Sequence, residues 1–114
     1  MPKKGLLQQY KYADVSTCHI TQKDAELLEQ AAKQEYTAIE PKEFPFTIAA
    51  YPEGFFISLP GKDHDFAENL RNLAAYGLSK ECVKLFRRCV NEGVYVLRLD
   101  ADAYEVKSIK SFDW

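Results

Sequence analysis

A thiol and an imidazole stand next to each other where a predicted strand gives way to a helix. Cys18 and His19 lie in the run Ser16-Thr17-Cys18-His19-Ile20-Thr21. A helix N-terminus favours the thiolate form of a nearby cysteine, and a histidine within reach can serve as its base. However, adjacent strand residues point to opposite faces of a sheet, which places this pair poorly for such chemistry. We therefore expect Cys18 to pack in the core and His19 to hydrogen-bond at the end of the sheet.

An enzyme is the alternative interpretation of these side chains. A small hydrolase or transferase would use Cys18 or His19 together with Asp100, and its thiol would react faster than a free cysteine; His19 could also take part in binding. The sequence contains no glycine-rich phosphate loop, no serine-hydrolase elbow and no cysteine or histidine spacing typical of zinc sites. No motif fixes a reaction, and we expect a protein that is not an enzyme.

Acidic residues and a second histidine follow two of the predicted strands. Carboxylate oxygens and imidazole nitrogens at such positions are able to bind a divalent cation. The residues concerned are Asp63, His64, Asp100 and Asp102. The same residue types are common in turns and helix caps, and Asp65 is expected to cap a helix. We therefore predict neither a metal ion nor any other cofactor.

Basic side chains recur at helical spacing along one predicted helix. They are Lys80, Lys84, Arg87 and Arg88, and Arg71 adds a further charge. A stripe of this kind is most often a solvated helix face, but it can also meet an acidic partner or phosphates. The net charge of the chain is −2, which argues against nucleic-acid binding through counterion release. Lys84, Arg87 and Arg88 form a second contact patch, and nucleic-acid binding is the third function considered.

Aromatic residues supply the first contact patch. The chain has seven Phe, seven Tyr and one Trp in 114 residues. Tyr10 and Tyr12 belong to the first predicted strand, whereas Phe112 and Trp114 lie at the C-terminal end of the sequence. The C-terminal pair would be costly to leave in water, so it either folds back against the sheet or anchors a partner. These four aromatic residues are the expected contacts with another protein.

Alternating apolar residues predict the strands. The first runs from Tyr10 to Cys18, and a hairpin over 46–59 has Pro52-Glu53-Gly54 as its loop. The apolar run 94–99 predicts a central strand covered on both faces, and 104–106 a short edge strand. The predicted helices run from a Thr21 cap to about Tyr36, from an Asp65 cap to Gly77, and from a Ser79 cap to Gly93.

The elements follow the order β-α-β-β-α-α-β. This order resembles the split β-α-β, or ferredoxin-like, plan with an extra helix in the second crossover. We predict an α+β fold with a single, mostly antiparallel sheet backed by helices. The 114 residues suit one domain, and residues 1–9 are expected to form a flexible arm.

Composition points to the cytoplasm. The three cysteines, Cys18, Cys82 and Cys89, lack metal or redox spacing, which is typical of free thiols in a reducing compartment. The sequence shows neither a signal peptide nor an apolar run long enough to cross a membrane. We expect a cytoplasmic protein without membrane contact, and leave its oligomeric state open, a homodimer being one option.

Both ends of the chain resemble a known family. The run 16–21, and Leu97-x-Leu-Asp100-x-Asp102 followed by Phe112-Asp113-Trp114, are similar to segments of a family of short bacterial proteins of unknown function. Members are often carried on plasmids, phages and other mobile elements. The resemblance implies an accessory role in such an element, including interference with a host defence system. The residues that it implies to form a shared structural signature are His19, Asp100 and Trp114.

The sequence as a whole favours a small non-enzymatic protein-binding module. Many aromatic residues lie on a small scaffold, and no group of side chains is spaced for a defined reaction. The expected partner is another protein, whose identity the sequence does not give.

Overall fold

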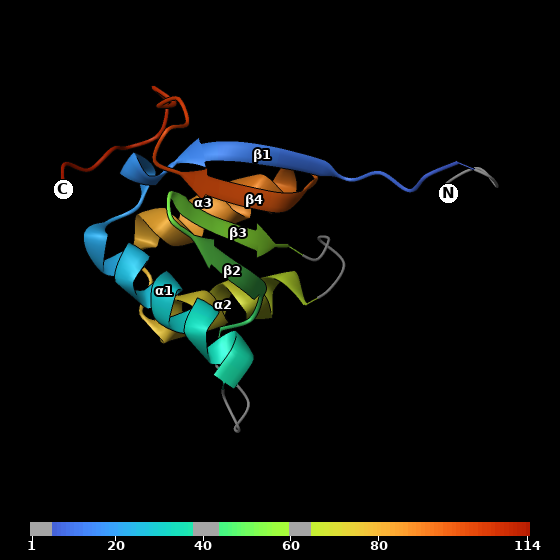
Figure 1. Cartoon of the computed structure of the whole chain (residues 1–114), viewed down its shortest axis with the longest axis horizontal. Helices are drawn as coiled ribbons and strands as arrows, with labels where there is room; N and C mark the ends of the chain where they lie inside the picture. The colour runs from blue at the N-terminus through green and yellow to red at the C-terminus, as the bar shows by residue number, and fades with distance from the viewer. Residues whose placement is uncertain (1–5, 38–43, 60–64) are drawn as a thin grey trace.

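Four strands and three α-helices make up the described part of the chain, which comprises residues 6–37, 44–59 and 65–114 of a computed structural model (Figure 1). The strands are β1 (Lys11–Ser16), β2 (Thr47–Tyr51), β3 (Gly54–Ser58) and β4 (Val94–Asp100). They form one sheet in the spatial order β1-β4-β3-β2. β1 and β4 run parallel, whereas the two other pairs run antiparallel. The predicted α+β class with a mostly antiparallel sheet is confirmed.

The helices begin largely where their capping residues predict. They are α1 (Gln22–Thr37), α2 (Phe66–Tyr76) and α3 (Lys80–Asn91), and a short 3-10 helix, η1 (Thr17–His19), precedes α1. At α1, Thr21 and Asp24 exchange hydrogen bonds between side chain and backbone N–H, which completes a capping box. At α3, the Ser79 hydroxyl accepts from the N–H of Cys82. Gly77 ends α2 in the left-handed conformation, as predicted.

Asp65 does not cap α2 in the predicted way. Its backbone lies in the left-handed region, with φ of 52°, and its side chain makes no cap hydrogen bond. Asp is among the few residues other than glycine that tolerate this conformation. The prediction was wrong because aspartate is common both at helix caps and in left-handed turns, so the residue type alone does not tell the two apart.

The chain order β-α-β-β-α-α-β is confirmed, but the spatial order differs from the split β-α-β plan. In that plan one strand separates the two strands that a crossover helix joins. Here both β4 and β3 lie between β1 and β2, which α1 joins. The second crossover contains two helices, α2 and α3, so the chain returns in the opposite direction. β4 therefore pairs antiparallel with β3 and occupies the next place in the sheet.

One face of the sheet, the inner face, is covered by the helices. Its residues, in register across the strands, are Ala13, Val15, Leu97, Leu99, Ile57, Phe55, Ile48 and Ala50. Most of them belong to the buried core, together with Leu28 of α1, Leu73 of α2 and Phe86 of α3, each fully buried. All three helices thus contribute to one layer of side chains against the inner face.

The opposite, outer face of the sheet carries polar and aromatic side chains. Its residues are Tyr12, Asp14, Ser16, Val96, Arg98, Asp100, Phe56, Ser58, Thr47, Ala49 and Tyr51, with Gly54 among them. β4 is a central strand, as predicted, but it is not covered on both faces. Leu97 and Leu99 point into the core, whereas Val96 and Arg98 on the outer face remain partly exposed. The alternation was not recognised in the sequence because β4 consists mostly of apolar residues on both faces.

Two predictions about turns and the C-terminus need correction. The hairpin loop consists of Pro52 and Glu53 alone, because Gly54 already pairs with Tyr51. Residues 104–106 form no strand; the C-terminal segment, residues 101–114, contains turns without regular secondary structure.

None of the helices in the described part of the chain has the length and apolarity that a bilayer span requires.

Candidate functional site

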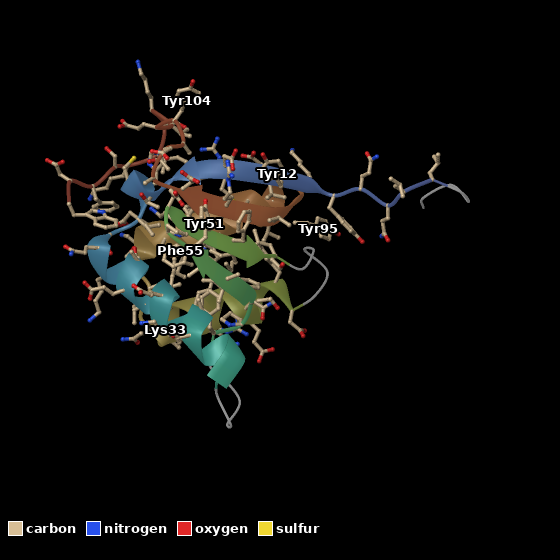
Figure 2. All side chains as sticks on the ribbon, viewed as in Figure 1. Tyr12, Lys33, Tyr51, Phe55, Tyr95 and Tyr104 are labelled. Carbon is tan, nitrogen blue, oxygen red and sulfur yellow. The ribbon has the colours of Figure 1, made fainter. Side chains whose placement is uncertain are left out.

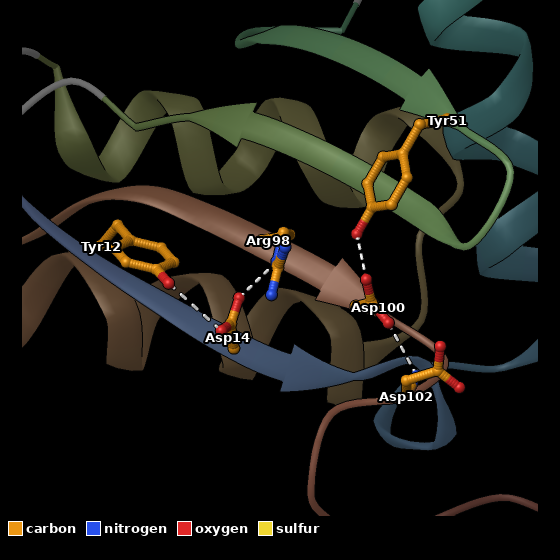
Figure 3. A network of polar contacts seen from close by, with 6 residues as sticks. All are labelled: Tyr12, Asp14, Tyr51, Arg98, Asp100 and Asp102. Atoms are coloured by element: carbon orange, nitrogen blue, oxygen red, sulfur yellow. Dashed lines mark hydrogen bonds and ion pairs between the residues drawn. The ribbon is translucent and has the colours of Figure 1, made fainter.

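An ion pair joins the edge strand β1 to β4 on the outer face. The Arg98 Nε donates to Oδ1 of Asp14 on the neighbouring strand at 2.5 Å, and the Tyr12 hydroxyl donates to Oδ2 of Asp14 at 3.3 Å (Figure 3). Asp14 and Arg98 are direct partners in the parallel register, so the backbone places their side chains together. Both side chains remain about one third exposed, at 34% each, so the pair contributes orientation more than stability.

A second polar group lies where β4 ends. The Tyr51 hydroxyl donates to Oδ2 of Asp100 at 2.5 Å, and the Asp102 N–H donates to Oδ1 of Asp100 at 2.7 Å. Desolvation and the hydrogen bond to Asp100 raise the pKa of Tyr51 to about 12. The hydrogen bonds from Tyr51 and from the Asp102 backbone lower the pKa of Asp100. Asp100 is therefore a buried, ionised acceptor that holds one donor on each carboxylate oxygen.

Exposed aromatic rings border these polar groups. Tyr12 is 56% and Phe56 42% exposed, both on the outer face. The Phe56 ring packs on Tyr51 with centroids 5.0 Å apart, and Tyr10 packs on Tyr95 at 4.6 Å. Figure 2 shows Tyr12 and Tyr95 near the same end of the sheet. On the outer face the exposed rings are therefore those of Tyr12 and Phe56, and the Tyr10–Tyr95 pair adds exposed ring surface outside it.

His19 is fully buried and holds the C-terminal segment. Its Nε2 accepts from the Val106 N–H at 2.9 Å, and its Nδ1 lies 2.9 Å from the Lys110 carbonyl oxygen. Because an amide N–H only donates, Nε2 carries no proton, and Nδ1–H must donate to the carbonyl. The expectation of a hydrogen-bonded His19 at the end of the sheet is confirmed. Neither ring nitrogen is left to act as a base.

Cys18 has no catalytic partner within the described residues. Its backbone N–H donates to Ser16, and its carbonyl accepts from the Phe112 N–H. No hydrogen bond joins Cys18, His19 and Asp100, each of which is bonded elsewhere. Cys18 is partly exposed rather than packed in the core, contrary to our expectation, because it lies in η1 beside the C-terminal segment.

The two other cysteines are structural. Cys82 and Cys89 lie on the buried side of α3. Burial raises the pKa of Cys82 well above its ordinary value and that of Cys89 to about 11. Both thiols therefore stay protonated and unreactive at neutral pH.

The aromatic residues of the C-terminal segment fold back on the domain. The Trp114 indole N–H donates to the Ile20 carbonyl at 2.9 Å, while 55% of the residue stays exposed. The Phe112 ring is partly buried and lies under the Lys110 ammonium, 5.2 Å from its centroid. Of the two outcomes considered from the sequence, folding back is the one observed, and the exposed part of Trp114 remains available for contact.

The basic stripe of α3 forms one wall of a groove. Lys80, Lys84 and Arg88 face Lys110 of the C-terminal segment across a space of about 410 Å³. Arg88 also pairs with Glu92 at 2.8 Å and lowers the pKa of that carboxyl. Arg87 is exposed but does not line the groove. We call this feature the basic groove.

The residues considered for a metal ion are not assembled in the described structure. Asp63 and His64 lie outside the described residues. Asp100 accepts from two donors, and its neighbour Asp102 is exposed. Among residues 6–37, 44–59 and 65–114, no three histidine, cysteine or acidic side chains are grouped as metal ligands.

Sequence reasoning missed four residues that shape these surfaces. They are Arg98, Tyr51, Phe56 and Lys110. The alternation of β3 and β4 could have placed Phe56 and Arg98 on one face. Tyr51 and Lys110 gave no local signal, because their importance depends on which segments become neighbours.

The comparisons with known proteins identify a family without a known activity. Residues 12–114 match the C-terminal domain of a family of unknown function, DUF5983. No curated protein and no solved structure matches the chain. The match covers nearly all of the described sheet, the three helices and the C-terminal segment, and it agrees with the resemblance read from the two ends of the sequence. The chain therefore belongs to the family DUF5983.

Proposed function

We propose that this domain is a non-enzymatic module that binds another protein through the outer face of its sheet. The observation that carries the proposal is that the helices cover the inner face alone, while Tyr12 and Phe56 stay exposed on the other side. Large exposed aromatic rings are unfavourable in water and are enriched in protein interfaces. Their clustering on one rigid sheet favours a flat contact surface.

The polar groups of the outer face support recognition of one kind of partner. Asp14 and Arg98 satisfy each other, but the exposed side chain of Asp102 adds negative charge just beyond the end of β4. The Ala101 N–H donates to the Glu53 carbonyl, so the hairpin turn with its own carboxylate lies beside them. We infer a partner surface with an apolar centre that meets Tyr12 and Phe56, and with a basic residue that faces this acidic end.

The partner is proposed to be a host protein. The family resemblance at both ends of the chain implies an accessory role in a plasmid, phage or other mobile element. We propose that the domain acts in such a setting by occupying a surface of a host protein, and that inhibition of a defence protein is the specific form of this action.

The test is capture of a protein partner by outer-face variants. The tagged domain, Tyr12→Ser with Phe56→Ser, and the control Tyr104→Ser are incubated with extract of the source cell at near-physiological salt. Tyr104 is 94% exposed but lies on the C-terminal segment, away from the sheet (Figure 2). We expect the wild type and the control to retain the same protein and the double variant to lose it. Equal capture by all three, or capture by none, contradicts the proposal.

A further inference from the structure

The basic groove concentrates positive charge on a chain that is negative overall. Its lining contains four cations, Lys80, Lys84, Arg88 and Lys110, and one carboxylate, Glu81. The net charge of the chain is −2. Within the described residues, neither Lys80 nor Lys84 forms an ion pair. The two lysines of α3 therefore keep their charge available, whereas Arg88 is already paired with Glu92.

The groove has two walls from distant parts of the sequence and an apolar base. α3 provides one wall and residues 108–110 the other. Arg88 bridges them, since its Nη1 donates to the Ser108 hydroxyl at 3.4 Å. Leu85 and Ile109 line the groove between the cations and pack against the buried core. Cationic rims over an apolar base suit a ligand that is both acidic and apolar.

The spacing of the cations matches an extended chain. Lys80, Lys84 and Arg88 follow at intervals of four residues, which corresponds to about 6 Å along a helix. Alternate side chains of an extended peptide lie about 6.6 Å apart. Acidic residues at alternate positions of such a peptide therefore come into register with the cations of α3.

We propose that the basic groove binds an extended acidic peptide segment of a partner protein, with acidic residues at alternate positions. The apolar base takes an aliphatic side chain of the same segment, and Glu81 pairs with a flanking basic residue. Nucleic acid fits less well, because none of the lining residues is aromatic and single-stranded nucleic acids require rings on which bases stack. This surface is separate from Tyr12 and Phe56, so the inference goes beyond the function proposed above.

A fluorescent peptide of alternating Asp and Leu residues tests the inference by anisotropy titration against the purified domain. Lys84→Glu and Lys110→Glu reverse one charge on each wall, and both side chains are exposed, so the fold is retained. We expect each variant to weaken binding about tenfold, the equivalent of about 1.4 kcal/mol. Arg87→Glu makes the same charge change on α3 outside the groove and should leave the affinity within about twofold.

Three outcomes overturn the inference. The first is absence of peptide binding to the wild type at low salt. The second is an equal loss for Arg87→Glu, which would indicate unspecific attraction to the whole helix. The third is tighter binding of a single-stranded oligonucleotide than of the peptide, in which case the groove is a nucleic-acid site. Because Tyr12→Ser with Phe56→Ser leaves the groove intact, that variant should bind the peptide normally, which separates the two proposals.

Discussion

Tyr51 reaches Asp100 across a strand that lies between them. Tyr51 ends β2, Asp100 ends β4, and the β3 residue in register with both is Gly54. The Tyr51 hydroxyl donates to the Asp100 carboxylate at 2.5 Å (Figure 3), and Gly54 lets β3 approach β4 at this point, because a Cβ there would meet the Leu99 carbonyl oxygen. The polar end of the outer face therefore depends on a residue that contributes no functional group.

We predict that Tyr51 ionises later than an ordinary tyrosine. Its pKa is raised from 10.0 to about 12, so its stabilising contribution is complete below pH 10 and is lost as the pH rises toward 12. Absorbance titration of tyrosinate should show a late-ionising group that is missing in Tyr51→Phe, and the stability of that variant should fall less steeply above pH 10. If the curve of Tyr51→Phe differs from that of the wild type only by the loss of a tyrosine that ionises near pH 10, the prediction is contradicted.

Gly54→Ala should be among the most destabilising single changes in the sheet. A Cβ atom there would lie 1.7 Å from the Leu99 carbonyl oxygen, a contact that only movement of β3 from β4 can relieve. We expect a loss above about 3 kcal/mol in the free energy of unfolding, measured in urea. Gly93→Ala is the matched control, because Gly93 has φ of 80° with open space around it. Strain alone should cost about 1–2 kcal/mol there, and equal losses would refute the steric argument.

Asp24 connects the beginnings of two helices. Its Oδ2 accepts from the Thr21 N–H at 3.0 Å and from the Ser79 hydroxyl at 2.6 Å, and its Oδ1 accepts from the Ser79 N–H at 2.7 Å. The carboxylate is fully buried. Asp24→Ala leaves donors at α1 and α3 without an acceptor, so we expect a loss of about 3 kcal/mol. Thr21→Ala removes a single cap and should cost about 1 kcal/mol. Similar losses for the two variants would show that the link to Ser79 contributes nothing.

Local patterns in the sequence predicted most elements because local interactions form them. The hairpin followed from alternation around Pro52, and α3 from a Ser79 cap with an apolar stripe. Thr21 and Ser79 were each recognised as caps. Their connection through Asp24 was not predicted, because the two segments are 55 residues apart and nothing local brings them together.

The arrangement of the elements was not predictable in the same way. Pairing of β1 with β4, and the hydrogen bond from Tyr51 to Asp100, depend on contacts between distant segments. The C-terminal segment was harder to place, since its groups that bond to His19 and Cys18 are backbone N–H and carbonyl groups, which are the same in every residue. The basic stripe of α3 was visible in the sequence, but its opposite wall at Lys110 was not.

His19 is predicted to be the residue that keeps the C-terminal segment in place. His19→Ala removes partners from the Val106 N–H and the Lys110 carbonyl and opens a cavity, so we expect a loss of about 2–4 kcal/mol. Limited trypsin digestion should then cleave at Lys107 and Lys110 in the otherwise folded variant. Tyr104→Ala changes an exposed residue of the same segment and should leave both stability and cleavage unchanged.

Stability and trypsin cleavage, measured together, show whether His19 holds only the C-terminal segment or supports the whole core. If His19 holds only the segment, cleavage in His19→Ala accelerates by more than the global loss of stability explains, because the segment opens while the sheet stays folded. If cleavage rises only in proportion to global unfolding, the segment is part of the core, and its release cannot occur alone. Lys110 lines the basic groove, so release of the segment would also abolish binding of the acidic peptide. Peptide affinity therefore reports the position of the segment independently of global stability.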